Sequence, residues 1–441
     1  MHPKVLLNTC TELVALVLKL DHPADTVVSR YFREQRQLGP RERATLANTA
    51  YMVLRKKLLF EHLAPFGSGP RERRLAILGL AYSLQEQGQR TGQSSAAPPG
   101  DGLLQAALTP QESDWLLQCK RIQTDLLLER HRHNLPEWLV SPLKQQLGPE
   151  FWPLVHALDQ TAPLDLRVNT LSSKREDICQ ELTALGIPSQ PTPYSPWGVR
   201  IHGKPALSQL ELFQRGAVEV QDEGSQLLAL LVQAKRGDMV VDFCAGAGGK
   251  TLALGAAMRN AGRLYALDTS AHRLDALKPR LARSGLSNVH PVVIAHERDD
   301  RIKRLRGKID KVLVDAPCSG LGTLRRNPDL KWRQSPDSVT QMAAKQLLIL
   351  QSAARLLKPG ARLVYATCSL LQAENEDIVH AFDAEPGYQP LSAADILTQL
   401  RITDAAALCA GGPDGGRFLR LWPHRHGTDG FFAAVWEKST S

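Results

Sequence analysis

The stretch MVVDFCAGAGGKT, residues 239–251, decides the fold because an apolar run leads through a glycine-rich turn into residues that suit a helix. Glycines let the backbone approach a ligand closely and leave amides at a helix N-terminus free to bind a carboxylate or phosphate. A dinucleotide fingerprint would read GxGxxG, and a phosphate loop would need glycine in place of Cys244. Neither pattern is present, so the turn predicts a small-molecule cradle without naming its ligand.

Around this stretch, short apolar runs alternate with helical patterns. Apolar runs occur at 239–243, 264–267, 289–294, 311–314 and 363–366, and helical patterns occur at 251–259, 271–283 and 339–357. Strands that alternate with helices form βαβ units, which predicts an α/β fold with a parallel sheet. Two later runs, 417–421 and 431–436, predict a terminal hairpin.

The second apolar run ends at Asp268, 26 residues after Asp242. An acidic residue at this place in a nucleotide-binding fold can accept both hydroxyls of a ribose. The spacing therefore favours a cofactor of the adenosine type. The alternative is a surface Asp268 that caps the following helix.

Two cysteines end predicted strands: Cys318 follows VLVDAP (312–317) and Cys368 follows LVYAT (363–367). In open α/β sheets, ligands bind beyond the carboxyl ends of the strands, so both thiols are expected to face one crevice. Either cysteine alone could be a small buried apolar side chain, which is the commoner fate of a free cysteine. Their shared position favours a catalytic role.

The sequence Asp315-Ala316-Pro317-Cys318 suits methylation of a pyrimidine ring carbon. Methyltransferases that act on amino groups carry Asp/Asn-Pro-Pro-aromatic at this strand end, whereas here a cysteine stands at the reactive position. The C5 atom of cytosine is a poor nucleophile until a thiolate adds to C6. Basic surroundings can lower the pKa of the thiol that must supply this thiolate.

Length and composition predict a reduced cytoplasmic protein of two or three domains. No run approaches the roughly 18 apolar residues that a membrane helix needs, and no secretion signal begins the chain. The seven cysteines include no CxxC pair, so we expect neither a disulfide framework nor a metal site. A small, polar Pro/Gly-rich segment at 88–100 predicts a flexible loop.

The net charge of +9 is consistent with a polyanionic partner or with a solvated basic surface. Residues 298–333 contain 11 Lys/Arg against 5 Asp/Glu, so much of the excess surrounds Cys318. Positive charge beside a candidate active site favours nucleic acid as the substrate. We expect Arg325, Arg326, Lys331 and Arg333 to lie on the RNA path.

Several segments together make the chain resemble the bacterial RsmB (Fmu/Sun) type of ribosomal RNA cytosine-C5 methyltransferases, within the Nop2/Sun family. They are residues 242–251, 315–320 with 325–332, 366–369 with 374–376, and 429–432, and before them 166–170 and 220–226. The resemblance covers about residues 134–441 strongly and the first 130 loosely.

This resemblance implies a Rossmann-like class I methyltransferase sheet over residues 221–441. A small α/β RNA-binding module is expected at 134–220, and an all-α NusB-like domain at 1–133. It also implies S-adenosylmethionine as methyl donor, and 16S ribosomal RNA as substrate; we expect a monomer that needs no metal and no membrane.

The family also implies roles for individual residues. Cys368 adds to C6, Cys318 helps release the methylated RNA, and Asp315 contacts the cytosine and the cofactor side. Lys250 joins them as a catalytic residue.

For the cofactor, the resemblance names the turn and two later strand ends. Asp268 holds the ribose, and His296 or Glu297 takes the place of the aspartate usual near the adenine. The turn lines the methionine end with Cys244, Ala245, Gly246, Ala247, Gly248, Gly249 and Lys250.

Two other functions remain open. A methyltransferase acting on transfer RNA would carry the same catalytic motifs, and only the N-terminal resemblance points to small-subunit ribosomal RNA. A ribosome-assembly RNA-binding protein without catalysis is the other alternative, although both cysteines, Asp315 and the glycine turn count against it.

Overall fold

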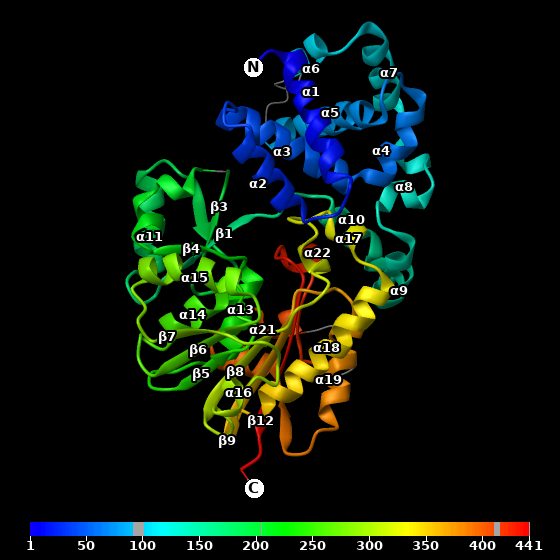
Figure 1. The fold of residues 1–441 in the computed structure, drawn as a ribbon. Helices are drawn as coiled ribbons and strands as arrows, with labels where there is room; N and C mark the ends of the chain where they lie inside the picture. The colour runs from blue at the N-terminus through cyan, green and yellow to red at the C-terminus, as the bar shows by residue number, and fades with distance from the viewer. Residues whose placement is uncertain (91–100, 204, 410–414, 441) are drawn as a thin grey trace. The chain divides into compact units, whose positions relative to one another are not determined.

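The computed structural model describes residues 1–90, 101–203, 205–409 and 415–440 (Figure 1). The chain forms two compact units. Unit 1 comprises Met1–Gln160 and Leu324–Ser335, and unit 2 comprises Thr161–Thr323 and Pro336–Ser441. None of the described helices is both long and apolar enough to cross a membrane.

Unit 1 is helical, as expected for the N-terminal region. Its helices are α1 (Pro3–Val17), α2 (Ala24–Glu34), α3 (Pro40–Arg55), α4 (Lys57–Leu63), α5 (Arg71–Arg90), α6 (Asp101–Ala107), α7 (Pro110–Arg121), α8 (Glu129–His133), α9 (Glu137–Leu147), α10 (Phe151–Leu158) and the short α17 (Leu330–Arg333). The loop expected over 88–100 begins later than predicted, because α5 continues through Arg90; residues 91–100 lie outside the described part of the chain.

The core of unit 1 forms where α1, α3 and α5 pack together around Leu7, Leu13 and Leu54. A glycine makes this packing possible. A Cβ at Gly79 would lie 2.6 Å from a methyl group of Val53, so only glycine lets α5 approach α3 this closely.

Unit 2 begins with a small four-stranded antiparallel sheet in the order β2-β3-β1-β4. Its elements are β1 (Leu164–Val168), α11 (Arg175–Ala184), β2 (Ser189–Pro191), β3 (Gly198–Ile201), α12 (Glu211–Gln214) and β4 (Val218–Val220). All four strands and both helices lie within the segment 134–220, for which a small α/β module was expected.

The large sheet of unit 2 has the order β10-β12-β9-β8-β5-β6-β7, with β11 paired to β12. Its strands are β5 (Met239–Asp242), β6 (Arg263–Asp268), β7 (Val289–Val293), β8 (Ile309–Asp315), β9 (Leu357–Thr367), β10 (Tyr388–Leu391), β11 (Leu419–Leu421) and β12 (Phe431–Lys438). The five strands from β5 to β9 pair in parallel, which confirms the predicted parallel α/β sheet.

The terminal hairpin is confirmed by the antiparallel pairing of β11 and β12, and β12 also inserts between β9 and β10. Its connection contains a short helix, α22 (Pro423–His426). The chain order reverses between β5 and β8, and such a switch point leaves a crevice beyond the strand ends.

Helices cover both faces of this sheet (Figure 1). One apolar cluster joins the sheet to α13 (Glu223–Leu231), α14 (Gly249–Ala257), α20 (Ala393–Gln399) and α21 (Ala405–Cys409). A second cluster joins the opposite face to α18 (Pro336–Ala354) and α19 (Glu376–Asp383). The remaining helices of this sheet's connections are α15 (Ala271–Ser284) and α16 (Asp300–Lys303).

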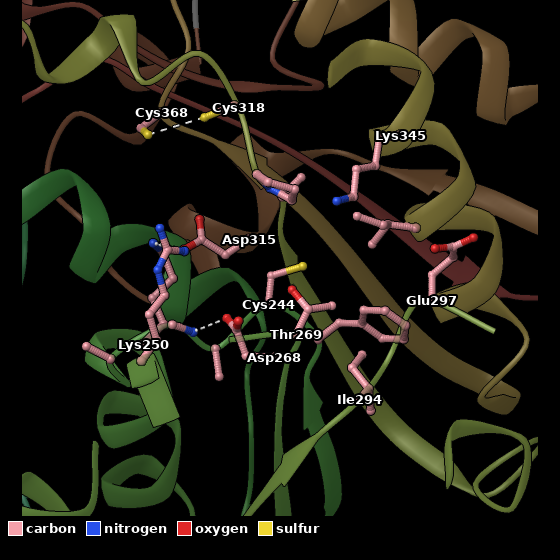
Figure 2. A pocket seen from close by; sticks show the side chains of 18 of the residues that line it. Cys244, Lys250, Asp268, Thr269, Ile294, Glu297, Asp315, Cys318, Lys345 and Cys368 are labelled. Carbon is pink, nitrogen blue, oxygen red and sulfur yellow. Dashed lines mark hydrogen bonds and ion pairs between the residues drawn. The ribbon is translucent and has the colours of Figure 1, made fainter. Parts of the chain in front are cut away.

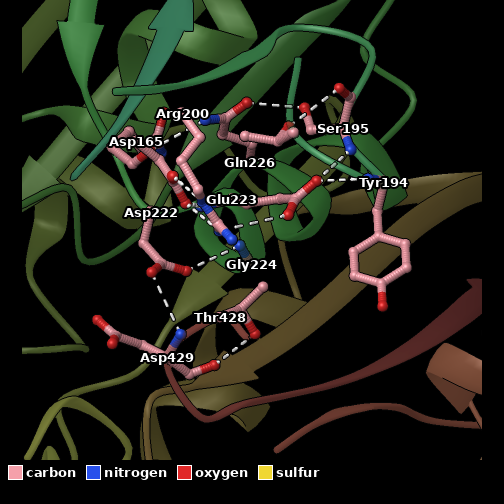
Figure 3. A network of polar contacts seen from close by, with 12 residues as sticks. Asp165, Tyr194, Ser195, Arg200, Asp222, Glu223, Gly224, Gln226, Thr428 and Asp429 are labelled. Carbon is pink, nitrogen blue, oxygen red and sulfur yellow. Dashed lines mark hydrogen bonds and ion pairs between the residues drawn. The ribbon is translucent and has the colours of Figure 1, made fainter. Parts of the chain in front are cut away.

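A buried polar network links the small sheet to α13 (Figure 3). Arg200 on β3 donates to both carboxylate oxygens of Asp165 on β1, over 2.7 and 2.9 Å. Glu223 at the start of α13 accepts from the backbone N–H groups of Tyr194 and Ser195, over 2.5 and 2.7 Å. These paired charges hold the small sheet and the helix that leads to β5 in one arrangement.

Candidate active site

A cavity of about 610 Å³ lies at the carboxyl ends of the central strands of unit 2 (Figure 2). Its volume is typical of a small-molecule site. Cys318 and Cys368 lie together at one end, while Ile294, Glu297 and Lys345 lie across the cavity from Lys250. The predicted meeting of both cysteines, the glycine turn and Asp268 at one crevice is therefore confirmed.

The glycine turn forms one wall of the cavity. Every residue from Cys244 to Lys250 lines it, with the exception of Gly248. Gly248 has a φ of +85°, and a Cβ there would lie 2.1 Å from the Leu277 side chain. Its contribution is thus to the conformation that turns the chain into α14, rather than to the surface of the cavity.

Asp268 sits at the end of β6 with an exposure of only 7%. Its Oδ2 accepts from the Gly246 N–H over 2.8 Å, and its Oδ1 accepts from the Ser270 N–H over 2.7 Å. Each carboxylate oxygen keeps a second lone pair for a ligand hydroxyl. The helix-capping alternative is wrong, because the side chain that caps α15 is that of Ser270.

Two neighbouring residues were expected near the adenine of the cofactor. His296 and Glu297 both line the cavity, after β7 ends at Val293. His296 is exposed, and its Nδ1 accepts from the Arg298 N–H over 3.1 Å. Glu297 is half-buried and anchored through its carbonyl, which accepts from Ser352.

Lys250 and Asp315 form an ion pair of 2.7 Å at the wall of the cavity. Burial alone would lower the pKa of Lys250, but the attraction and hydrogen bond of Asp315, with smaller contributions from Cys368 and Asp242, together raise it. Lys250 is therefore a fixed cation, and it holds the Asp315 carboxylate in one orientation at the end of β8.

A second carboxylate lies beneath the turn. Burial raises the pKa of Asp242 to about 7, and its Oδ2 accepts from the Thr251 hydroxyl over 2.7 Å. Its Oδ1 has no hydrogen-bond partner among the described residues. A buried carboxylate with one unsatisfied oxygen favours its protonated form, in line with the raised pKa.

The two catalytic candidates are in direct contact, with 3.3 Å between the sulfur atoms of Cys318 and Cys368. The hydrogen bond to Cys368, together with burial, raises the pKa of Cys318 well above its usual value. Burial likewise raises the pKa of Cys244, so this thiol lines the cavity as a small neutral side chain. Among the described residues, no group of His, Cys, Asp and Glu side chains is placed to hold a metal ion.

Sequence reasoning missed part of the lining. Gln221 and Ser225, which share a 3.0 Å hydrogen bond, belong to a segment singled out only for its resemblance. Met342 and Lys345 come from α18, and no motif in that helix marks them. Only the packing of α18 against the sheet brings them to the cavity.

The basic residues after Cys318 were expected to lie on the RNA path, but two of them are not exposed. Arg325 and Lys331 are buried, with exposures of 6% and 4%. The Lys331 ammonium donates to the Arg55 carbonyl over 2.8 Å, and Arg333 pairs with Asp329. The expectation that Lys331 lies on the RNA path is wrong, because its charge is directed at the end of α3 inside unit 1.

Comparison with known proteins identifies the family of this chain. The model of the family "16S rRNA methyltransferase RsmB/F" matches residues 229–437, and that of the RsmF/B-like ferredoxin-like domain matches residues 135–208. The chain is 31% identical to a probable ribosomal RNA small subunit methyltransferase B of Synechocystis, over 95% of this chain and 96% of the relative. A Bacillus subtilis protein with the same description is 33% identical, over 69% of this chain and 66% of the relative.

Solved structures show the same fold. The crystal structure of the protein PH0851 has a TM-score of 0.78 and 26% identity, and covers 99% of both chains. A methyltransferase homologue from Pyrococcus horikoshii has a TM-score of 0.61 and 26% identity, over 72% of this chain and all of that one. By sequence and fold, the chain belongs to the RsmB/F family of 16S ribosomal RNA methyltransferases.

Proposed function

We propose that this methyltransferase acts on C5 of a cytosine in 16S ribosomal RNA, and that Cys368 is the nucleophile that adds to C6. The observation that carries the proposal is the contact between Cys318 and Cys368 at one end of the cavity, 3.3 Å apart. Two thiols in contact suit a reaction in which one bonds to the substrate and the other assists its release.

The methyl donor of this methyltransferase is S-adenosylmethionine, which supplies an electrophilic methyl group when bound. The cavity fits this molecule. A Cβ added at Gly246 would meet no heavy atom within 4 Å, so the turn leaves open space there for a ligand. Asp268 would hold the ribose, His296 or Glu297 would face the adenine, and the turn from Cys244 to Lys250 would hold the methionine end.

The assignment of the two thiols is supported by their surroundings. The raised pKa of Cys318 keeps that thiol protonated at neutral pH, which suits a group that assists release rather than one that attacks. Cys368 lies close enough to Lys250 for a Cys368 thiolate to contribute to the raised pKa of that lysine. The lysine would in turn stabilise the thiolate.

In the proposed reaction, the Cys368 sulfur forms a bond to C6, and the electrons of the C5–C6 double bond make C5 nucleophilic. After C5 is methylated, its proton passes to solvent water, which restores the double bond and expels Cys368 as a thiolate. Asp315, oriented by Lys250, would hold the cytosine edge during these steps. Cys318 would assist the breakdown of the covalent adduct.

Small-subunit ribosomal RNA is favoured over transfer RNA because the curated relatives are named for the small ribosomal subunit. We further propose that the protein works as a cytoplasmic monomer without a metal. The proposed domains are a helical region at 1–133, an RNA-binding module at 134–220 and a catalytic domain at 221–441.

Trapping the adduct tests the proposal. Purified Cys318→Ala protein, incubated with its RNA and S-adenosylmethionine, should give a covalent protein–RNA band on a denaturing gel, because release is impaired. Cys368→Ala should give no band and no methyl transfer. A band in Cys368→Ala and none in Cys318→Ala would reverse the two roles. Bisulfite sequencing should show that one cytosine of 16S ribosomal RNA is methylated in the parent strain and unmethylated in a deletion strain.

A further inference from the structure

A buried carboxylate lies between the two loops that carry the cysteines. Glu374 has no measurable exposure and ends a short 3-10 helix, Gln372–Glu374. Its Oε1 accepts from the Ser319 N–H over 2.8 Å and from the Gln346 amide over 3.1 Å. Its Oε2 accepts from the hydroxyls of Ser319 and Ser369, each over 2.5 Å.

Both serine partners of Glu374 are neighbours of the two cysteines in the sequence. Ser319 directly follows Cys318, and Ser369 directly follows Cys368. One carboxylate is therefore bonded to the residue next to each thiol. We call Glu374, Ser319 and Ser369 the thiol clamp.

The pairing of β8 with β9 does not by itself bring the two thiols together. The ladder between β8 and β9 ends with Asp315 opposite Ala366, and the Ala316 N–H then donates to the Ala366 carbonyl over 2.8 Å. Cys318 lies two residues beyond Ala316, and Cys368 lies two residues beyond Ala366. The clamp acts there, at the point where the strands no longer set the spacing of the two chains.

A second layer of buried groups holds the clamp. Gln346 on α18 donates to the Pro317 carbonyl over 2.9 Å, and the Tyr365 hydroxyl donates to the Glu374 carbonyl over 2.6 Å. Asn375 donates to the Ser369 carbonyl over 3.1 Å. Burying a carboxylate is costly unless it is hydrogen-bonded, so four neutral donors on one buried anion indicate a site with a fixed geometry.

We propose that Glu374 is a positioning residue that sets the distance between Cys318 and Cys368. The inference rests on the function proposed above, in which one thiol attacks and the other assists release. Glu374 itself does not reach the cavity, because it is fully buried and its carboxylate is occupied by the serines and Gln346. Its effect is transmitted through the two loops.

The direct test measures the separation of the thiols. Diamide oxidises two adjacent thiols to a disulfide and is itself reduced to the hydrazine, taking up the two hydrogen atoms. The Cys318–Cys368 disulfide should form quickly in the cofactor-free wild-type protein and about tenfold more slowly in Glu374→Gln, measured by mass spectrometry after alkylation of the remaining thiols. Asp377→Asn removes an exposed carboxylate one turn away and should leave the rate unchanged.

Kinetics give the second readout. Glu374→Gln should lower kcat about tenfold or more, leave KM for RNA and S-adenosylmethionine nearly unchanged, and accumulate covalent RNA adduct as Cys318→Ala does. If Glu374→Gln does not fold, Ser369→Ala removes only the hydroxyl on the Cys368 side and should show the same changes on a smaller scale. A wild-type disulfide rate in either folded variant overturns the inference.

The two proposals can fail separately. The disulfide rate depends only on the spacing of the thiols and uses no RNA. If Cys368→Ala still transferred methyl groups, the proposed function would be wrong, while a slow disulfide in Glu374→Gln would still show that the clamp sets the spacing. If the adduct gel behaved as expected and the disulfide rate were unaffected, only the clamp would be wrong.

Discussion

At the scale of single residues, the cavity depends on carboxylates in different environments. Asp315 is paired with Lys250, Asp268 accepts two backbone N–H groups, and Asp242 is buried with one oxygen unpartnered among the described residues. The neighbours of each carboxylate therefore decide whether it is held by a cation, bonded to the backbone or able to hold a proton near neutral pH.

The ribose role of Asp268 makes a prediction about the cofactor. Replacement by alanine removes charge-assisted hydrogen bonds worth about 1.5–3 kcal/mol, so affinity for S-adenosylmethionine should fall by about ten- to a hundredfold. Titration calorimetry measures this loss. Asp275→Ala, on the exposed side of α15, should bind like the wild type. Equal affinity in the Asp268 and Asp275 variants would reject the ribose role.

Asp242 makes a prediction about pH. Burial raises its pKa from 3.8 to about 7, so the folded state binds a proton that the unfolded state has released between those values. The free energy of unfolding should therefore decrease as pH rises from about 4 to 7, by up to about 4 kcal/mol from this group. Urea unfolding of the cofactor-free protein at pH 5 and pH 8 should show a smaller decrease in Asp242→Asn. Parallel pH profiles in both proteins would contradict the assignment.

At the scale of elements, close backbone contacts place the Cys368 loop. The Gly322 N–H donates to the Cys368 carbonyl over 2.8 Å, and the Gly430 N–H donates to the Gly322 carbonyl over 2.9 Å. The segment that leads into β12 thus supports the 3-10 turn Leu321–Thr323, which in turn supports the strand end that carries Cys368.

Gly322→Ala tests this contact. An added Cβ would lie 2.1 Å from the Gly430 carbonyl oxygen and 2.8 Å from that of Cys368, so the backbone has to move beside Cys368. Overpacking of this kind costs about 1–3 kcal/mol, and kcat should fall together with stability. Thermal unfolding and single-turnover methyl transfer measure the two effects. Gly415→Ala, where a Cβ would meet nothing within 4 Å, is the matched control.

At the scale of the whole molecule, the chain enters unit 1 twice. Residues 1–160 form most of it, and the segment Leu324–Ser335 joins it after leaving the catalytic sheet. Within unit 1 the Trp332 indole donates to the Leu54 carbonyl over 2.7 Å, and Lys57 lies 5.0 Å from the centre of its ring. A segment only six residues after Cys318 is therefore part of the helical unit's core contacts.

Because Lys331 is buried in unit 1, we expect its replacement to change thermal stability but not the salt dependence of RNA affinity. Lys331→Met should leave the slope of log affinity against log salt unchanged, whereas the loss of one phosphate contact would reduce it by about 0.9. The same change should alter thermal stability, because the buried ammonium bonded to Arg55 is lost. Arg298→Gln, which removes an exposed charge from the same basic stretch, is the comparison. A shallower slope in Lys331→Met would return this lysine to the RNA path.

Local patterns predicted much of the fold and the site. The apolar runs gave five parallel strands, because a strand buried on both faces, such as β5, is apolar throughout and needs no distant partner to be recognised. The ends of those strands placed Cys318, Cys368, Asp268 and the glycine turn at one crevice, because parallel strands carry their carboxyl ends to one edge. The strand β2 and the helices α20 and α21 were not predicted, since they are short.

The sequence by itself determined the family, the parallel sheet and the edge at which the chemistry occurs. Only the tertiary structure decided which charges are free to act there. Lys331 and Arg325 look like an RNA-binding cluster in the sequence but are buried, and Glu374 looks like one acidic residue among several but is bonded to both cysteine loops. The physical reason is that side-chain burial and hydrogen bonding between distant segments depend on packing, which local periodicity does not encode.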